Sequence, residues 1–176
     1  MTRAGTFALV VSSVALAGCS SGSNHASSTT SPSTTGSTAT TGQPNAQALA
    51  RSARAALDAN HKLSVFVLWH NRIPAWASAS TRGPALASLQ SAAATRRSRG
   101  VRARLLSDHR RVVSLKLDPS YTSATAVVVD RQRVQPSGRN GQPLGRTVVL
   151  NERARYELRR IGESDRFVVW RVVLAR

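Results

Sequence analysis

Residues 167–174 read FVVWRVVL and give the strongest β-strand signal in the sequence. An extended FVVWRVVL segment is apolar on both faces, which is typical of a central strand. The preceding GESD at residues 162–165 predicts a tight turn, so this strand needs an adjacent antiparallel partner. We therefore expect residues 151–161 to form a strand, although the same residues would also suit a helix.

Three further strands are expected upstream of this one. Even positions of residues 148–158 carry one apolar face: Val148, Leu150, Ala154, Tyr156 and Leu158. Odd positions of residues 101–117 carry another: Val101, Ala103, Leu105, Val113, Leu115 and Leu117. Residues 121–134 are rich in β-branched side chains, and turn signals lie at residues 118–120 and 135–145. Alternation with a period of two predicts antiparallel strands joined by hairpins.

Helices are expected before residue 101. Asn45 is a suitable N-cap for a helix that carries Leu49, Ala53 and Leu57 on one side. Residues 62–70 fit either a continuation of that helix or a strand, and the stop signal of Ile73-Pro74 favours the helix. We expect a short helical turn after Pro74 around Trp76.

A second long helix is expected after the short turn. Pro84 suits its first position, and Leu86 and Leu89 would form its inner side. Gly100 would terminate it.

Helices followed by strands predict an α+β domain, with N-terminal helices packed on a four-stranded antiparallel meander. Three stretches carry a resemblance to a known family: residues 81–86 (TRGPAL), the arginine-rich helix end leading into Gly100-Val101, and residues 167–172. In this order they resemble the nuclear transport factor 2-like family. The resemblance implies a cone-like domain whose long, bent sheet wraps helices around a pocket.

The N-terminus carries an export signal. Arg3 gives a positive start, and a mostly apolar run of about 12 residues follows, which is too short to span a bilayer. Leu16-Ala17-Gly18-Cys19 contains the single cysteine and resembles the lipobox of bacterial lipoproteins. That resemblance implies a signal peptide over residues 1–18 and a diacylglyceryl group on Cys19. A plain secretory peptide and an Ala-rich anchor are the alternatives.

Residues 19–45 predict a tether. They consist mainly of Ser, Thr, Gly, Ala and Pro and cannot bury enough apolar surface to fold. A flexible coil of roughly 26 residues has a root-mean-square reach of about 25–30 Å. Residues 46–176 would then form one α+β domain outside the cytoplasm, anchored to the bacterial cell membrane through acylated Cys19. With that thiol lipidated, the folded part has no cysteine chemistry.

The charge balance predicts an anionic partner. The 25 basic and 8 acidic side chains give a net charge of +17. An exported domain meets anionic lipid and wall polymers rather than nucleic acid, so we expect no nucleic-acid partner. The densest cluster is the candidate anionic-surface site: Arg96, Arg97, Arg99, Arg102, Arg104, Arg110 and Arg111. Part of this cluster could instead complement a helix C-terminus, or reflect a GC-rich genome.

No catalytic motif, cofactor site or metal-ligand spacing is evident, and no protein partner is indicated. The weak candidates for proton chemistry are the Asp58/His61 pair, His70, Asp108-His109 and Glu152. His109 and Glu152 are the candidate pocket residues. We expect an arginine to pair with Glu152 and lower its pKa. The sequence favours a non-catalytic binding or adaptor module, and an acid–base enzyme resembling isomerases or cyclases of the same fold is the alternative.

Overall fold

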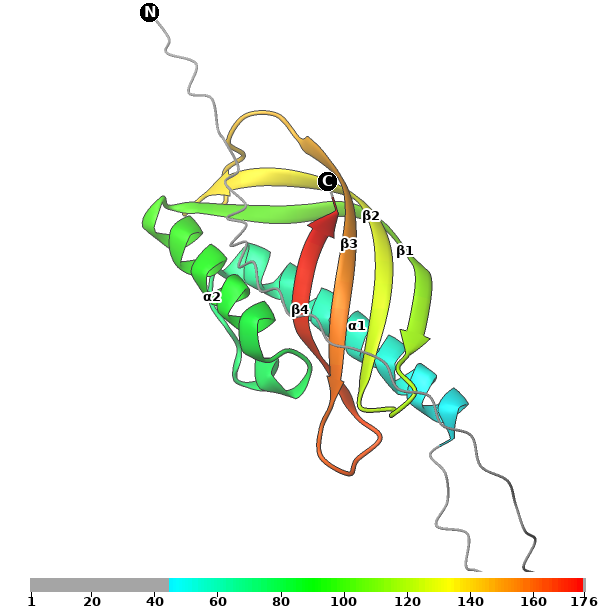
Figure 1. The fold of residues 1–176 in the computed structure, drawn as a ribbon. Coiled ribbons are helices and arrows are strands. Elements are labelled where there is room, and N and C mark those ends of the chain that lie inside the picture. Colours follow the sequence, from blue (N-terminus) through cyan, green and yellow to red (C-terminus); the bar gives the residue numbers. More distant parts are fainter. Residues whose placement is uncertain (1–44, 176) are drawn as a thin grey trace, which may run out of the picture. The chain divides into compact units, whose positions relative to one another are not determined.

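The structure, a computed structural model, describes residues 45–175. The expected signal sequence, Cys19 and nearly all of the tether lie outside these residues. The described chain forms helices α1 (Ala46–His70), η1 (Ala75–Ala79) and α2 (Gly83–Ser98), and then strands β1 (Val101–Leu117), β2 (Ser123–Gly138), β3 (Val148–Arg160) and β4 (Phe167–Ala175). This is an α+β fold of helices packed on a four-stranded antiparallel sheet (Figure 1).

Helix α1 begins and ends at polar caps. The Asn45 side chain accepts hydrogen bonds from the backbone N–H groups of Gln47 at 3.0 Å and Ala48 at 3.2 Å, which confirms the predicted N-cap. Asn71 ends the helix in the left-handed conformation, with φ 52°. Residues 62–70 are therefore helical, as expected. Within residues 45–175 no helix combines the length and apolar character needed to cross a bilayer.

The second helical segment also follows the sequence signals. The 3₁₀ helix η1 follows Pro74, and Pro84 occupies the first turn of α2. Gly100, with φ +66°, follows the end of α2 and allows the chain to turn directly into β1. Gly83 has φ +56°, and a Cβ atom there would lie 2.8 Å from the Trp170 ring, so only glycine fits.

The sheet is a meander in the order β1-β2-β3-β4, with each strand antiparallel to its neighbour. Residues 148–160 form a strand, so the helical alternative there is wrong. The expectation that residues 167–174 form a central strand is also wrong, because β4 is an edge strand. Its first residues, 167–169, are buried, and the Ser80–Arg82 backbone hydrogen-bonds to Val169 along this edge, whereas residues 171–175 are exposed.

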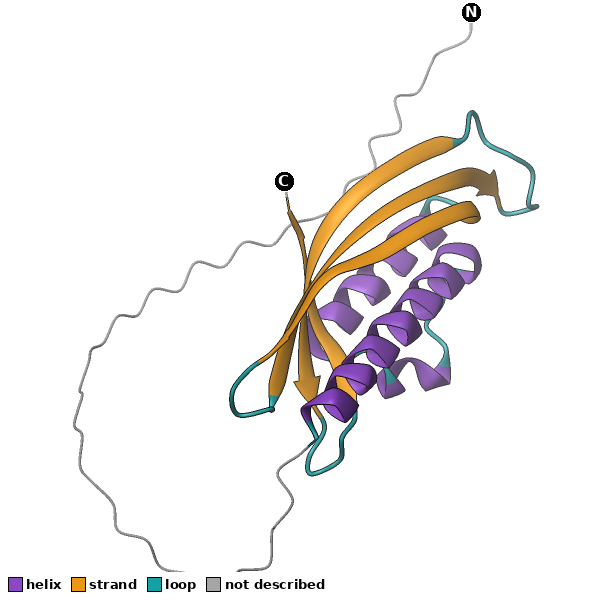
Figure 2. Cartoon of the chain, turned by 90° about the vertical axis from the view of Figure 1, so that its right-hand side faces the viewer, coloured by secondary structure: helices purple, strands orange, loops and turns teal. Residues whose placement is uncertain are grey.

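The long strands bend, and both helices lie on the inner side of the bend (Figure 2). Register shifts interrupt β1 between Leu105 and Ser107 and again between Val112 and Ser114. Such bulges bend a strand and reverse which positions face inward. Val113 is consequently 46% exposed, contrary to the uninterrupted odd-numbered pattern expected from the sequence.

Two hydrophobic clusters hold the helices on the sheet. The larger joins Leu49 and Leu57 of α1 to Val128, Leu158 and Val169 of the sheet, all at 1% exposure or less. The smaller joins α1, η1 and α2 through Leu63, Val67, Ala77 and Ala93. Both clusters lie within one compact unit of the chain, residues 40–176, so this unit contains a complete core of its own.

Candidate functional site

A row of ionisable side chains crosses the inner face of the sheet. The register places Arg110 of β1 opposite Asp130 of β2, and Asp130 opposite Glu152 of β3. Directly paired residues point to the same face of a sheet, so these three side chains face the helices together. Asp108 begins the next row, opposite Gln132.

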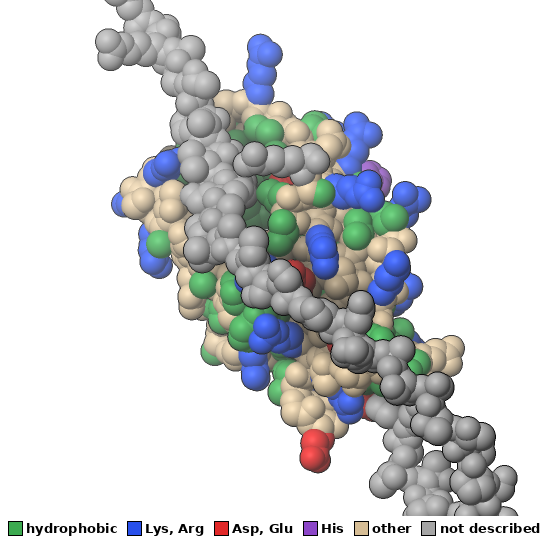
Figure 3. Space-filling model, viewed as in Figure 1, with side chains coloured by type: hydrophobic (Ala, Val, Ile, Leu, Met, Phe, Trp, Pro, Cys, Tyr) green, Lys and Arg blue, Asp and Glu red, His purple; other side chains and the backbone are tan. Residues whose placement is uncertain are grey.

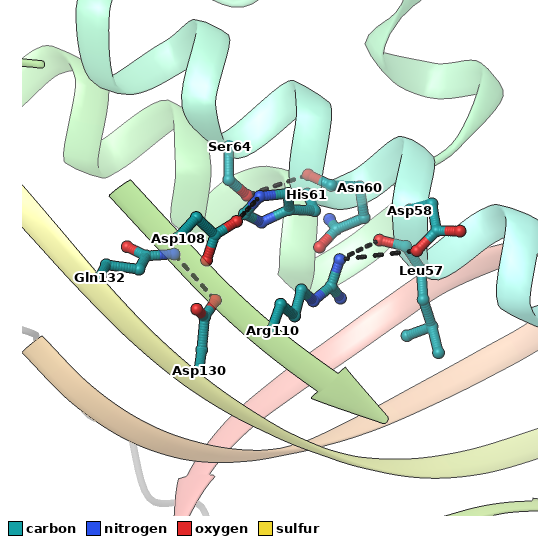
Figure 4. A network of polar contacts seen from close by, with 9 residues as sticks. All are labelled: Leu57, Asp58, Asn60, His61, Ser64, Asp108, Arg110, Asp130 and Gln132. Carbon is teal, nitrogen blue, oxygen red and sulfur yellow. Dashed lines mark hydrogen bonds and ion pairs between the residues drawn. The ribbon is translucent and has the colours of Figure 1, made fainter. Parts of the chain in front are cut away.

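Helix α1 adds a histidine to this row. His61 Nε2 lies 2.6 Å from Asp108 Oδ2, and the two side chains are 20% and 22% exposed. Burial lowers the pKa of His61 and outweighs the opposing effect of Asp108. We call His61, Asp108, Arg110, Asp130 and Glu152 the inner polar cluster, and Figure 4 shows the first four of these side chains.

Asp130 is the carboxyl group in this cluster whose pKa is raised to about 7. Burial is the main cause, followed by the neighbouring carboxyl group of Asp108. Two ionised carboxylates only accept hydrogen bonds, so a bond between these two side chains requires a proton. Gln132 Nε2 donates to Asp130 Oδ2 at 2.8 Å and leaves Asp130 Oδ1 available for that proton.

Arg110 is the cation of the cluster, and its side chain is only 11% exposed. Its Nη1 donates to the Leu57 carbonyl at 2.9 Å and lies 4.0 Å from Asp58 Oδ1. The guanidinium carbon lies 5.7 Å from the centre of the Tyr156 ring. Nε and Nη2 are buried without a hydrogen-bond partner among the described residues. Arg110 therefore acts through its charge and packing on several neighbours rather than through one close carboxylate pair.

Glu152 faces inward, as the alternation of β3 predicted, but the expected arginine partner is wrong. Burial raises the pKa of Glu152. The ion pairs among residues 45–175 include none to Glu152. Asp130 occupies the position between Glu152 and Arg110 in the row, so the arginine is two strands away. Glu152 is thus a poorly solvated acid without a close cation.

The expected pocket position of His109 is also wrong, because His109 is exposed on the outer face, opposite Arg131. The bulge at Leu106 puts even-numbered residues of this part of β1 on the inner face, and Asp108 takes the inward position. Asp130 was not among the candidate residues predicted from the sequence. The available signal was the alternation of β2, because Asp130 shares the even-numbered positions of this strand with Val128 and Val134, which are both buried.

The seven arginines expected to form one anionic-surface site are separated in the structure. Arg110 lies inside, Arg111 points to the outer face, and Arg104 lines a cavity beside α1. Arg96 is structural: its Nε donates to Asn71 Oδ1 at 3.0 Å and its Nη2 donates to the Val67 carbonyl at 3.2 Å. Arg97 and Arg102 line a second cavity, and Arg99 is exposed after α2. These arginines are close in the sequence but do not share one surface, because they lie at the end of α2 and on both faces of β1.

A different basic surface appears on the outer face of the sheet. The register and exposure place a group of exposed cations there: Arg111, Lys116, Arg131, Arg133, Arg153, Arg155, Arg159 and Arg171. Glu157 is the acidic side chain on the same face, and its Oε2 lies 3.9 Å from Arg171 Nε. Figure 3 shows Lys and Arg side chains spread among apolar ones over the face in view. We call this surface the outer basic face.

Two cavities lie near the C-terminal end of α1. The first has a volume of about 280 Å³ and is lined by Val65, Phe66, Trp69, His70, Arg104 and Leu105. The second has a volume of about 180 Å³ and is lined by His70, Asn71, Arg97, Gly100, Arg102 and Arg139. His61 and the acids of the inner polar cluster line neither of these two cavities. Residues 45–175 contain no group of His, Cys, Asp and Glu side chains arranged to hold a metal ion.

Comparison with known proteins supports the fold. No protein-family model and no curated protein sequence matches the chain. Among solved structures, it is similar to the intermembrane space region of the chloroplast protein ARC6, with a TM-score of 0.57 and 16% sequence identity. The match covers 71% of this chain and 95% of that one. At this identity the similarity concerns the fold alone.

Replacing Asp130 by asparagine should stabilise the domain at high pH. In the folded chain the pKa of Asp130 is about 7, above the value of about 3.9 in an unfolded chain. The folded state therefore binds more protons between these values, and stability falls as pH rises through them. An amide can still donate to Asp108 and accept from Gln132, and it carries no charge. We expect Asp130→Asn to gain about 1–2 kcal/mol near pH 8, a value reduced for solvent screening.

The same substitution should change stability little near pH 5, where Asp130 is already protonated. Chemical denaturation at both pH values measures the difference. Asp165→Asn is the matched control, since Asp165 lies on the surface 3.0 Å from Arg160 and its loss should cost at most about 1 kcal/mol. Equal effects of Asp130→Asn at both pH values would contradict the raised pKa.

Proposed function

We propose that this protein is a membrane-anchored envelope lipoprotein whose nuclear transport factor 2-like domain is a non-catalytic binding module for an anionic lipid surface. The observation that carries the proposal is the outer basic face, where this group of exposed cations shares one side of the sheet with one carboxylate. Such a surface attracts anionic head groups with a strength that depends on salt.

Apolar side chains within the outer basic face support a lipid partner. Val129 lies between Arg111 and Arg153 in the register and is 36% exposed. Val149 and Val173 are each 47% exposed beside other arginines of this face. Exposed apolar groups among cations suit the boundary between head groups and acyl chains better than a fully hydrated polymer.

The expected tether supports the same proposal. Acylation of Cys19 would keep the domain within roughly 25–30 Å of the bilayer, and this holds the local concentration of head groups high. Residues 20–45 carry no Lys, Arg, Asp or Glu, so the charge that meets the bilayer belongs to the folded domain.

Binding to vesicles tests the outer basic face. We expect the unit of residues 40–176 to bind vesicles of anionic lipid and to be released as salt rises. Each cation near such a surface contributes about 1 kcal/mol, so changing Arg131, Arg153 and Arg155 together to glutamine should weaken binding about 100-fold at low salt. Co-sedimentation over a salt series measures this loss.

The matched control removes the same charge from the other side of the domain. Arg51, Arg54 and Lys62 are exposed on α1, which covers the inner face of the sheet. Changing these three to glutamine should leave vesicle binding within about 3-fold. An equal loss in both variants, equal binding to neutral vesicles, or binding to anionic wall polymer in place of vesicles would overturn the proposal.

A specific observation favours a second function, acid–base catalysis. A carboxyl group with a pKa of about 7 suits a general base at neutral pH, and Asp130 lies beside Asp108 and opposite Glu152. Exchange of hydrogen next to a carbonyl group for solvent deuterium, measured by NMR over a panel of small ketones and esters, tests this function. Exchange that is lost in Asp130→Asn would favour the enzyme over the binding module.

A further inference from the structure

The two cavities at the end of α1 differ in chemistry. Valine, phenylalanine, tryptophan and leucine supply most of the lining of the larger one. Three arginines, a histidine and an asparagine supply most of the lining of the smaller one, which has no carboxylate. The pair therefore presents an apolar compartment and a cationic compartment.

The cationic compartment is assembled from four separate parts of the chain. Arg97 comes from the end of α2, Arg102 from β1, Arg139 from the loop after β2, and His70 from the end of α1. None of the ion pairs within residues 45–175 involves these three arginines. Like charges brought together without a counter-charge repel one another, so an anion bound between them would stabilise this arrangement.

Gly100 lines this compartment next to Arg139. A Cβ atom at Gly100 would lie 3.2 Å from Arg139 Nε, so another residue there would shift the Arg139 side chain by a few tenths of an ångström. Its φ of +66° serves the chain reversal after α2 as well. The turn therefore requires the glycine, and Arg139 packs against it.

The two compartments are adjacent. His70 lines both of them. The guanidinium carbon of Arg102, from the cationic compartment, lies 6.0 Å from the centre of the Trp69 ring, which lines the apolar one. Together their volumes fall within the range of about 300–1,000 Å³ that is common for small-molecule sites.

We propose that these two cavities form one binding site for a single-chain anionic amphiphile, with its phosphate head group between Arg97, Arg102 and Arg139 and its acyl or alkyl chain along Val65, Phe66 and Trp69. This site takes individual lipid molecules, whereas the outer basic face meets a lipid surface. The two proposals use different arginines and stand or fall independently.

Titration with dodecyl phosphate below its micelle concentration tests the site. The unit of residues 40–176 is used, with Trp fluorescence and calorimetry as readouts. We expect saturable binding that weakens about 10-fold when the chain is shortened by two methylenes, because each buried methylene contributes a constant increment. Inorganic phosphate alone should bind at least 100-fold more weakly, and dodecyl phosphocholine, with its zwitterionic head, at least 10-fold more weakly.

Variants locate the binding. Arg97 and Arg139 are exposed side chains, so Arg97→Gln with Arg139→Gln should preserve the fold and lower the affinity about 30-fold or more. The matched control is Arg131→Gln with Arg153→Gln on the outer basic face, which should retain full affinity for dodecyl phosphate.

Equal losses in the two double variants would overturn the site, because net charge alone would then explain binding. Phosphate binding as tight as dodecyl phosphate binding, or no dependence on chain length, would also overturn it. If dodecyl phosphate does not bind but vesicles do, the two-cavity site is wrong and the proposal for the outer basic face is retained. If dodecyl phosphate binds but vesicles do not, the reverse holds.

Discussion

Replacing Arg110 by methionine should destabilise the domain by about 3 kcal/mol near pH 8. Arg110 is the cation of the inner face row, and its side chain is 11% exposed. Burial raises the pKa of Asp130 and of Tyr156, and the charge of Arg110 opposes both shifts, which means that it stabilises the ionised forms. Without it, Asp108, Asp130 and Glu152 would face one another with His61 as the remaining titratable base of the cluster.

The loss in Arg110→Met should depend on pH. Near pH 5 the acids of raised pKa take up protons, so their repulsion falls and the loss should shrink to about 1 kcal/mol. Methionine keeps most of the packing against Tyr156, so the charge is the main quantity that changes. Thermal and chemical unfolding at both pH values measure the effect, and about 3 kcal/mol corresponds to roughly 10 °C in Tm for a domain of this size.

Arg111→Met is the matched control for this experiment. Arg111 is the next residue along β1, points to the outer face and is exposed. Its replacement should change stability by no more than about 0.5 kcal/mol. Equal losses for Arg110→Met and Arg111→Met, or a loss at position 110 that is the same at both pH values, would mean that the inner polar cluster is not coupled as described.

Replacing Cys19 by alanine should convert the protein from almost fully membrane-bound to almost fully unanchored or uncleaved. Cys19 is the single cysteine, so it is the single thiol that can receive a diacylglyceryl group. Two acyl chains give stable anchoring, whereas a protein without them is held only by contacts of the folded domain. Detergent-phase partitioning and mass spectrometry of the mature N-terminus measure the change.

A high-salt wash is needed in this experiment, because the outer basic face would hold some unlipidated protein on anionic lipid at low salt. Ser20→Ala, one residue beyond the expected cleavage site, is the control and should stay anchored. A Cys19→Ala protein that is processed at the same position and withstands the wash would refute the lipoprotein hypothesis.

The inner polar cluster is costly for folding stability. Burial raises the pKa of Asp130 and Glu152, so both acids favour the folded state only when protonated. A domain selected for stability alone would be expected to hold apolar residues there, as it does one row away at Val112, Val128 and Ala154. This contrast between a polar row and the neighbouring apolar row favours acid–base catalysis as the second proposed function.

The sequence alone determined the local structure, because helix caps, proline stops and strand alternation act over a few residues. Asn45, Pro84 and Gly100 marked helix ends correctly. The alternation of residues 148–158 placed Ala154 and Leu158 in the core and Glu152 on the inner face. The number of strands and their meander order followed from the turns between them.

Only the tertiary structure decided which charges meet. The bulge at Leu106 places Asp108 rather than His109 on the inner face. No local sequence pattern in β1 predicts this bulge. The clustering of Asp108, Asp130 and Glu152 depends on the register of three strands, and the apolar and cationic cavities depend on where α1 and α2 end over β1. Register and helix placement are set by packing of the whole core, so side chains far apart in the chain acquire their partners only when that core forms.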